Sequence, residues 1–253
     1  MRLSIDLDLN YRHLNTKDWG EVRNEIDEKV KELLYRQGYR KSDIAINASY
    51  PLARITVKYT NSLGLDDNFK IEMGYMRRIP ILKTDTLKDF KHIGTQETFP
   101  IKSPIEEELF ANKWCVLLYR GTARDVFDVY QISKTRMDLE VFRKCSIVDS
   151  LMQGKPELHK INIEETIGRI QIDSNLRNKL QTEQLSKLDF NEMREQTIKF
   201  SEEMIKNLTQ NEIRAIERFF QLKIFEPNLI DEKGIFYEKV QDHPAIQWAL
   251  RGL

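Results

Sequence analysis

The sequence lacks an excess of charge of either sign and holds only two cysteines. Lys and Arg together number 40, and Asp and Glu together also number 40, so the formal net charge is +0. Such a chain does not coat nucleic acids through bulk charge, and any contact with them must come from a local patch. Cys115 and Cys145 lack a CxxC spacing. This excludes a disulfide framework and a structural zinc site, and it favours a reducing, cytoplasmic compartment.

Long apolar runs and several common catalytic motifs are also missing. No stretch approaches the roughly 18 consecutive apolar residues of a membrane span, and the opening MRLSIDLDLN does not resemble a signal peptide. We therefore expect no membrane partner. The absence of GxSxG, HExxH, GxxxxGK[ST] and GxGxxG leaves serine hydrolases, zincins, P-loop proteins and dinucleotide-binding proteins without their defining motifs. With 253 residues, of which 40% are hydrophobic, the chain can bury the core of one large or two modest domains.

Alternating apolar and polar residues at the start of the chain predict a half-buried strand over residues 3–11. Asp6 and Asp8 fall on its polar face, with Cα atoms about 6.5 Å apart. Two carboxylates so placed can bracket a divalent cation, because without a cation each would raise the pKa of the other. The alternative is an edge strand with a solvated acidic face, and the spacing alone leaves both open.

The next segments predict a helix and a hairpin. Apolar residues at helical spacing favour a helix over residues 18–35, with Thr16 as its N-cap and Gly38 as its stop. Two alternating runs follow, at 53–59 and 69–75, and the turn-forming residues between them favour an antiparallel hairpin.

Glu72 lies on the polar face of the second hairpin strand and could join the two aspartates. Three carboxylates that offer only oxygen ligands suit Mg²⁺ or Mn²⁺ better than zinc. In phosphoryl-transfer sites such ions neutralise the triphosphate and stabilise the leaving pyrophosphate. The alternative is that Glu72 is a cross-strand partner for a lysine or an arginine.

Helical spacing dominates the second half of the chain. Residues 80–104 hold no sustained period and predict a loop with one short element near 87–93, whereas helical spacing prevails from Glu106 onward. We therefore predict an α+β fold with a small mixed sheet and covering helices in residues 1–103, followed by a mostly helical domain in residues 104–253.

The segment EELFANKWCVLLYRGTARDVFDVYQ, residues 107–131, concentrates basic side chains. On a continuous helix Lys113, Arg120 and Arg124 would share one stripe. Gly121 and Thr122 are expected to break that helix, and a restart at Thr122 would turn free backbone amides toward a phosphate. Basic side chains and a carboxylate cluster are together what a nucleoside triphosphate (NTP) with its metal requires.

The same segment allows a purely structural interpretation. Its charged side chains could form salt bridges between two helices, and the residues concerned are Arg120, Arg124, Asp125 and Asp128. The spacing favours neither interpretation.

Taken together, these segments resemble the AbiEii-type nucleotidyltransferase toxin family, a branch of the DNA polymerase beta nucleotidyltransferase superfamily. The resemblance spans nearly the whole chain. It is carried by RLSIDLDLNY at 2–11, FKIEMGYMRRIP at 69–80, EELFANKWCVLLYRGTARDVFDVY at 107–130 and DHPAIQWALRGL at 242–253. The Lys…Arg…ArgAsp…Asp pattern is specific in combination with SxDxD.

The resemblance implies a role for each matching residue. Ser4, Asp6 and Asp8 match the metal-binding strand, and Glu72 falls where the superfamily places its third carboxylate. In the second motif, Lys113 matches a lysine that contacts nucleotide phosphates. Arg120 and Arg124 match residues that assist phosphate binding, and Asp125 belongs to the same nucleotide-binding element. Asp128 matches the family's further essential acid.

The resemblance also implies an activity and its partners. Family members transfer a nucleotide from an NTP to an acceptor, in some cases the 3′ end of tRNA, and are encoded beside an antitoxin. A Mg²⁺- or Mn²⁺-dependent nucleotidyltransferase toxin is therefore expected, with an NTP, an acceptor and a cognate antitoxin as partners. We expect the acids of the sheet and the basic helix to meet around one cleft.

One element of the family pattern does not precede Asp6 in this sequence. It is a Gly-Gly-Ser or Gly-Gly-Thr turn, which in the superfamily binds the triphosphate through backbone amides. The nucleotidyltransferase-like domain predicted over residues 1–103 therefore lacks the family's first motif at its N-terminal end. This leaves an alternative function, a catalytically silent, N-terminally truncated relative that acts as a binding or interaction protein.

Overall fold

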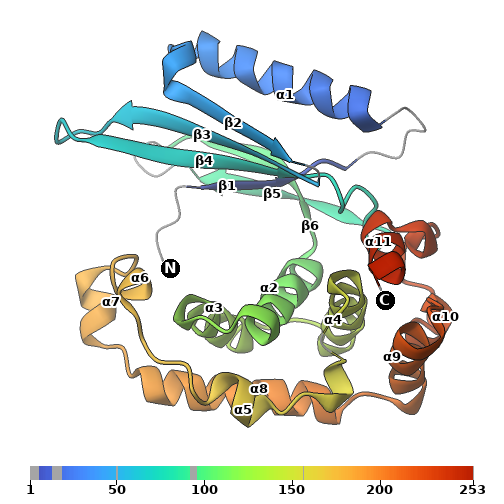
Figure 1. The fold of residues 1–253 in the computed structure, drawn as a ribbon. Helices are drawn as coiled ribbons and strands as arrows, with labels where there is room; N and C mark the ends of the chain where they lie inside the picture. Colours follow the sequence, from blue (N-terminus) through green and yellow to red (C-terminus); the bar gives the residue numbers. More distant parts are fainter. Residues whose placement is uncertain (1–5, 13–18, 50, 92–95, 156, 253) are drawn as a thin grey trace. The chain divides into compact units, whose positions relative to one another are not determined.

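The computed structural model describes residues 6–12, 19–49, 51–91, 96–155 and 157–252. The chain forms two compact units (Figure 1). One spans Leu3–Ile79, and the other spans Pro80–Leu253 together with Met1–Arg2. Ser4, Thr16 and the start of the predicted first strand lie outside the described residues.

The smaller unit contains the mixed sheet that the sequence predicts. Its elements are β1 (Leu7–Asn10), α1 (Trp19–Arg36), β2 (Ile44–Ser49), β3 (Leu52–Thr60) and β4 (Asp66–Gly74). The strand order is β1-β4-β3-β2, with β1 parallel to β4 and the other pairs antiparallel. The predicted hairpin of β3 and β4 is thereby confirmed, and its turn is closed by the Asn61 side chain, whose Oδ1 accepts hydrogen bonds from the Leu63 and Leu65 amides.

Helix α1 packs on one face of this sheet, as Figure 1 shows. Its Leu34 is buried with Ile55, Val57 and Ile71, which are the inward-facing residues of β3 and β4. A helix and a sheet that each carry one apolar face bury those faces against one another. The helix ends at Arg36, and Gly38 follows with a φ of 92°, the left-handed conformation that glycine adopts without a steric penalty.

The larger unit begins with a second sheet. The prediction of a loop over 80–104 is therefore wrong, although the short element predicted near 87–93 overlaps the first strand of this sheet. Strands β5 (Asp85–Lys91) and β6 (Thr98–Pro104) pair along their whole length in an antiparallel hairpin. Leu87 and Phe90 are three residues apart, so they point to opposite faces of the strand, and both are exposed. The strand therefore lacks the alternation of apolar and polar residues that would have predicted it. Phe90 packs against its cross-strand partner Phe99 with ring centroids 5.1 Å apart, a contact that only the pairing reveals.

The rest of the larger unit is helical, as predicted. The helices are α2 (Glu106–Arg120), α3 (Ala123–Ser133), α4 (Leu139–Gln153), α5 (Ile163–Ile167), α6 (Ser174–Arg177), α7 (Thr182–Ser186), α8 (Phe190–Lys206), α9 (Gln210–Leu222), α10 (Pro227–Ile230) and α11 (Pro244–Gly252). Trp114 on α2 is buried and donates a hydrogen bond from Nε1 to Ser201 Oγ on α8, at 2.9 Å. None of the helices in the described part of the chain combines the length and the apolar character that a membrane crossing requires.

The boundary predicted between residues 103 and 104 and the division of the structure into two units mark different features. Helix begins at Glu106, directly after β6, whereas the two compact units divide between Ile79 and Pro80. The β5–β6 hairpin therefore belongs to the same unit as the helices.

Candidate functional site

The face of the four-stranded sheet opposite α1 is polar, and it carries the predicted carboxylates. Asp8 is the register partner of Glu72 on the parallel neighbour, and Glu72 is the register partner of Arg54 on β3. Register partners point their side chains to the same side of a sheet, and neighbouring strands lie about 4.8 Å apart. Asp8, Glu72 and Arg54 thus form one row across three adjacent strands.

The two aspartates of the opening strand differ in their surroundings. Asp6 Oδ1 accepts a hydrogen bond from the backbone N–H of Lys70, at 3.1 Å, which holds its side chain against β4. Asp8 is exposed and makes no hydrogen bond or ion pair with any residue that the structure describes. An exposed carboxylate of this kind is open to a ligand.

Glu72 forms an ion pair with Arg54. The distance from Arg54 Nε to Glu72 Oε1 is 2.6 Å, and the two side chains are 48% and 28% exposed. This is the cross-strand partner that the sequence left open as the alternative for Glu72. Nothing in the sequence singles out Arg54, because its pairing with Glu72 becomes visible only once the hairpin register is known.

The carboxylates offer the right chemistry for a hard divalent cation. Their six oxygen atoms are the ligand type that Mg²⁺ and Mn²⁺ prefer. Glu72 Oε2 and the whole Asp8 carboxylate remain outside the hydrogen bonds and ion pairs of the described residues. Across the described ranges, however, no three His, Cys, Asp or Glu side chains converge as a ready-made metal site.

The basic segment folds as two helices joined by a tight turn, as predicted. Gly121 ends α2 with a φ of 64°, and Thr122 is the N-cap of α3. Thr122 and Asp125 form a capping box, in which each side chain accepts a hydrogen bond from the backbone N–H of the other residue. Because the turn interrupts the helix, the basic side chains are divided between α2 and α3.

Two ion pairs join α2 to α3. Arg120 on α2 binds the buried carboxylate of Asp125, with its Nε 3.0 Å from Oδ2, and this carboxylate raises the pKa of Arg120. Lys113 Nζ lies 2.8 Å from Asp128 Oδ2. These contacts are interhelical salt bridges of the kind that the structural interpretation expects.

Arg124 differs from the other basic side chains of this segment. It lies in the first turn of α3, is partly buried, and makes no hydrogen bond or ion pair with any described residue. The structure therefore brings together two groups of the predicted residues, each within its own unit. Asp6, Asp8 and Glu72 lie on the polar face of the sheet. The remaining predicted residues lie on α2 and α3, and they are Lys113, Arg120, Arg124, Asp125 and Asp128.

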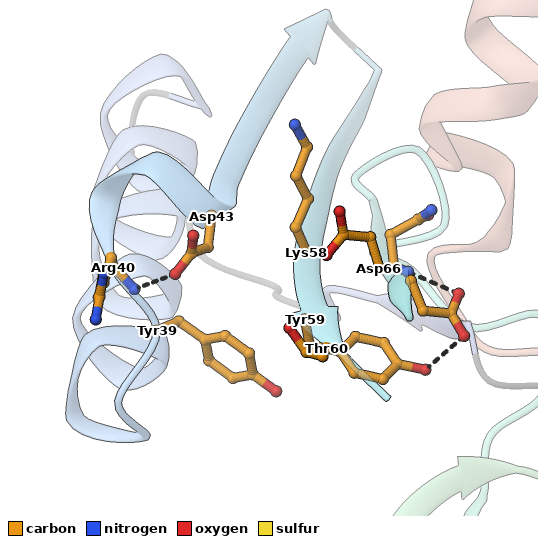
Figure 2. Close-up of a pocket in the computed structure, with 9 residues that line it drawn as sticks. Tyr39, Arg40, Asp43, Lys58, Tyr59, Thr60 and Asp66 are labelled. Atoms are coloured by element: carbon orange, nitrogen blue, oxygen red, sulfur yellow. Dashed lines mark hydrogen bonds between the residues drawn. The ribbon is translucent and has the colours of Figure 1, made fainter. Parts of the chain in front are cut away.

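A pocket of about 660 Å³ lies at the other end of the same sheet (Figure 2). Its walls come from the segment after α1, from the end of β3 and from the start of β4. In Figure 2 the Tyr59 hydroxyl donates a hydrogen bond to Asp67 at 3.2 Å, and the Arg40 amide donates one to Asp43 at 2.9 Å. Its described lining residues carry both signs of charge and include none of the predicted carboxylates.

Comparison with known proteins agrees with the resemblance found in the sequence. The sequence pattern of the family described as "Nucleotidyl transferase AbiEii toxin, Type IV TA system" matches residues 1–248. The solved structure of MenT4, a nucleotidyltransferase toxin from Mycobacterium tuberculosis H37Rv, shares the fold with a TM-score of 0.60 and 15% sequence identity. That match covers 90% of this chain and 77% of MenT4. A search of curated proteins gives no match. The chain therefore belongs to the AbiEii nucleotidyltransferase toxin family of type IV toxin–antitoxin systems.

Proposed function

We propose that the protein transfers a nucleotide from an NTP to an acceptor hydroxyl in a reaction that depends on Mg²⁺ or Mn²⁺. The observation that carries this proposal is the row of Asp8 and Glu72 on adjacent strands, with Asp6 on the same polar face. The acceptor hydroxyl would attack the α-phosphate in line with the leaving pyrophosphate.

Asp6, Asp8 and Glu72 would hold the divalent cation. When bound, the cation supplies positive charge for the phosphates and lowers the pKa of a coordinated hydroxyl. The chain itself contributes the orientation of its ligands. The backbone N–H of Lys70 fixes Asp6, and the strand register keeps Asp8 beside Glu72. Ser4, which matches the same family strand, would contact the nucleotide.

Lys113, Arg120, Arg124 and Asp125 would serve nucleotide binding, and Asp128 would be the further essential acid. The Lys113 side chain is 47% exposed, so its ammonium can reach a phosphate while Asp128 orients it. Arg124 has no partner among the described residues, so it can contact a phosphate directly. Arg120 and the buried Asp125 would act by fixing the turn from which α3 begins.

The partners follow from this chemistry and from the family. The donor would be an NTP, the acceptor an RNA such as the 3′ end of tRNA, and the cognate antitoxin would restrain the activity. A reaction between an NTP and tRNA would take place in the cytoplasm.

A transfer assay tests this proposal. Radiolabelled NTP and total tRNA are incubated with Mg²⁺ and either the wild type, Asp6→Ala or Asp8→Ala. We expect label in RNA with the wild type only. Asp66→Ala, an exposed carboxylate on β4 at the other end of the sheet, is the matched control and should label like the wild type. Equal labelling by all four proteins would remove the assignment of the aspartates.

A catalytically silent binding protein is the second candidate. The observation that favours it is that Glu72, Lys113 and Arg120 are each paired with an opposite charge inside the chain. Calorimetry with each NTP and Mg²⁺ separates the two. Micromolar binding supports the enzyme, whereas no binding together with no transfer supports the silent protein.

A further inference from the structure

The row of Asp8, Glu72 and Arg54 places one basic side chain beside two carboxylates, and Asp6 lies on the same face of the sheet. Arg54 occupies the strand next to Glu72, on the side away from Asp8, and all three point to the same face. Its Nε is 2.6 Å from Glu72 Oε1. A divalent cation bound by Glu72 and Asp8 would compete with this guanidinium for the same carboxylate.

We propose that Arg54 is a built-in counter-ion of Glu72, which neutralises this carboxylate while no metal is bound and is displaced when a divalent cation binds. The inference rests on the proposed metal-binding role of Asp6, Asp8 and Glu72. Arg54 then acts on the metal site through Glu72. Its guanidinium lowers the affinity for the divalent cation, because it competes for the Glu72 carboxylate and because its positive charge repels the cation.

The exposure of the pair makes such an exchange feasible. Half of the Arg54 side chain is exposed, so its guanidinium can move into water without being left as a buried, unpaired charge. Exposed ion pairs contribute little to stability, so breaking the pair costs little compared with the binding of a divalent ion. Glu72 Oε2 has no partner among the described residues and gives an incoming cation a first point of contact.

Lys58 provides a matched control. It lies on the same strand and the same face as Arg54, four residues along, and it is exposed with no ion pair to any described residue. The substitution Lys58→Gln removes one positive charge from the polar face without freeing a carboxylate. Arg54→Gln removes one positive charge and frees Glu72.

The test is a titration of the full chain with Mn²⁺ alone, in which electron paramagnetic resonance measures the free ion. Arg54→Gln should bind Mn²⁺ about three- to tenfold more tightly than the wild type, whereas Lys58→Gln should change the affinity by less than about twofold. Arg54→Lys keeps the charge and should lie between the wild type and Arg54→Gln. In the background of Glu72→Gln, the effect of Arg54→Gln should shrink to that of Lys58→Gln.

The outcomes separate this inference from the proposed function. If Arg54→Gln binds Mn²⁺ no better than Lys58→Gln while the wild type binds the ion, the counter-ion role is overturned and the metal site stands. If Arg54→Gln weakens binding in a protein whose circular dichroism is unchanged, the role is also overturned. If neither the wild type nor any variant binds Mn²⁺, both the metal site and the counter-ion role fall.

Discussion

Lys113 on α2 and Asp128 on α3 are joined by an ion pair with an N–O distance of 2.8 Å, across the turn at Gly121. The lysine is half-exposed and the aspartate is mostly covered. Asp128 therefore limits the orientations that the Lys113 ammonium can take, while leaving it accessible to an anion.

The first prediction concerns Lys113. Lys113→Ala should lower nucleotide transfer by about a hundredfold, because a positioned cation at a phosphate contributes most in the transition state. It should lower the free energy of unfolding by less than about 1 kcal/mol, since half-exposed ion pairs contribute little. The transfer assay and urea denaturation measure the two effects. Lys102→Ala removes the lysine of another exposed pair, with Asp85, and should retain transfer. Equal transfer by the two variants would contradict the role of Lys113.

The second prediction concerns Asp125, which holds three groups at the α2–α3 turn. Its Oδ2 accepts hydrogen bonds from the Thr122 amide and hydroxyl, at 3.2 Å and 2.6 Å, and from Arg120 Nε. Asp125→Ala should cost about 2 to 3 kcal/mol of unfolding free energy, because it removes the capping box and leaves these donors without an acceptor.

Thermal and urea denaturation test the Asp125 prediction. Asp89→Ala, on an exposed position of β5 without an ion pair to a described residue, is the control and should change the stability by less than about 0.5 kcal/mol. If both variants unfold at the same urea concentration, the turn does not depend on the Asp125 carboxylate.

The third prediction concerns the buried contact between α1 and Tyr75, the residue that directly follows β4. Tyr75 is almost fully buried, and its hydroxyl donates a hydrogen bond of 2.9 Å to Asp27 Oδ1. Burial, reinforced by this bond, raises the pKa of Tyr75. Tyr75→Phe should destabilise the protein by about 1 to 3 kcal/mol, because the buried carboxylate loses a donor.

The same unfolding measurement on Tyr35→Phe provides the control for Tyr75. Tyr35 lies on α1 with an exposed side chain, so the loss of its hydroxyl should be close to neutral. Similar destabilisation by the two variants would show that the Asp27 contact contributes nothing specific.

The fourth prediction concerns pH. Hydrogen bonds from Lys233 and Lys144 lower the pKa of Glu140 to about 2, from the usual 4.5. A carboxyl whose pKa is lower in the folded state adds stability above its unfolded pKa, and this contribution is lost as the pH falls through the folded pKa. The stabilisation of the folded state by ionised Glu140 should therefore be complete above about pH 4.5, and it should decrease progressively between pH 4.5 and 2.

Urea denaturation at pH 6 and at pH 3.5 tests the sign of this effect. Glu140→Gln should lose less stability between the two values than the wild type does, because the glutamine cannot be protonated. Glu202→Gln, at an exposed position of α8 without a partner among the described residues, should lose as much as the wild type. If Glu140→Gln lost more stability than the wild type between pH 6 and pH 3.5, ionised Glu140 would not be the stabilising form.

Local chemistry explains which elements could be predicted. The α2–α3 turn follows from Gly121 and Thr122, which favour a left-handed residue and an N-cap whatever surrounds them. The β3–β4 hairpin follows from two alternating runs and a short, turn-forming connection. The β5–β6 hairpin escaped prediction because its strands gain their stability from contacts across the pair, such as Phe90 with Phe99, and not from a repeating pattern within either strand.

The sequence by itself determined the family, the mixed sheet with its helical continuation, and the residues that carry charge in the two motifs. Side-chain alternation and turn chemistry are local, so they can be read along the chain. Only the tertiary structure decided that β1 lies parallel to β4 with Asp8 beside Glu72, that Arg54 pairs with Glu72, and that Asp128 pairs with Lys113. These contacts join residues far apart in sequence, and they depend on strand register and helix packing, which the whole fold sets.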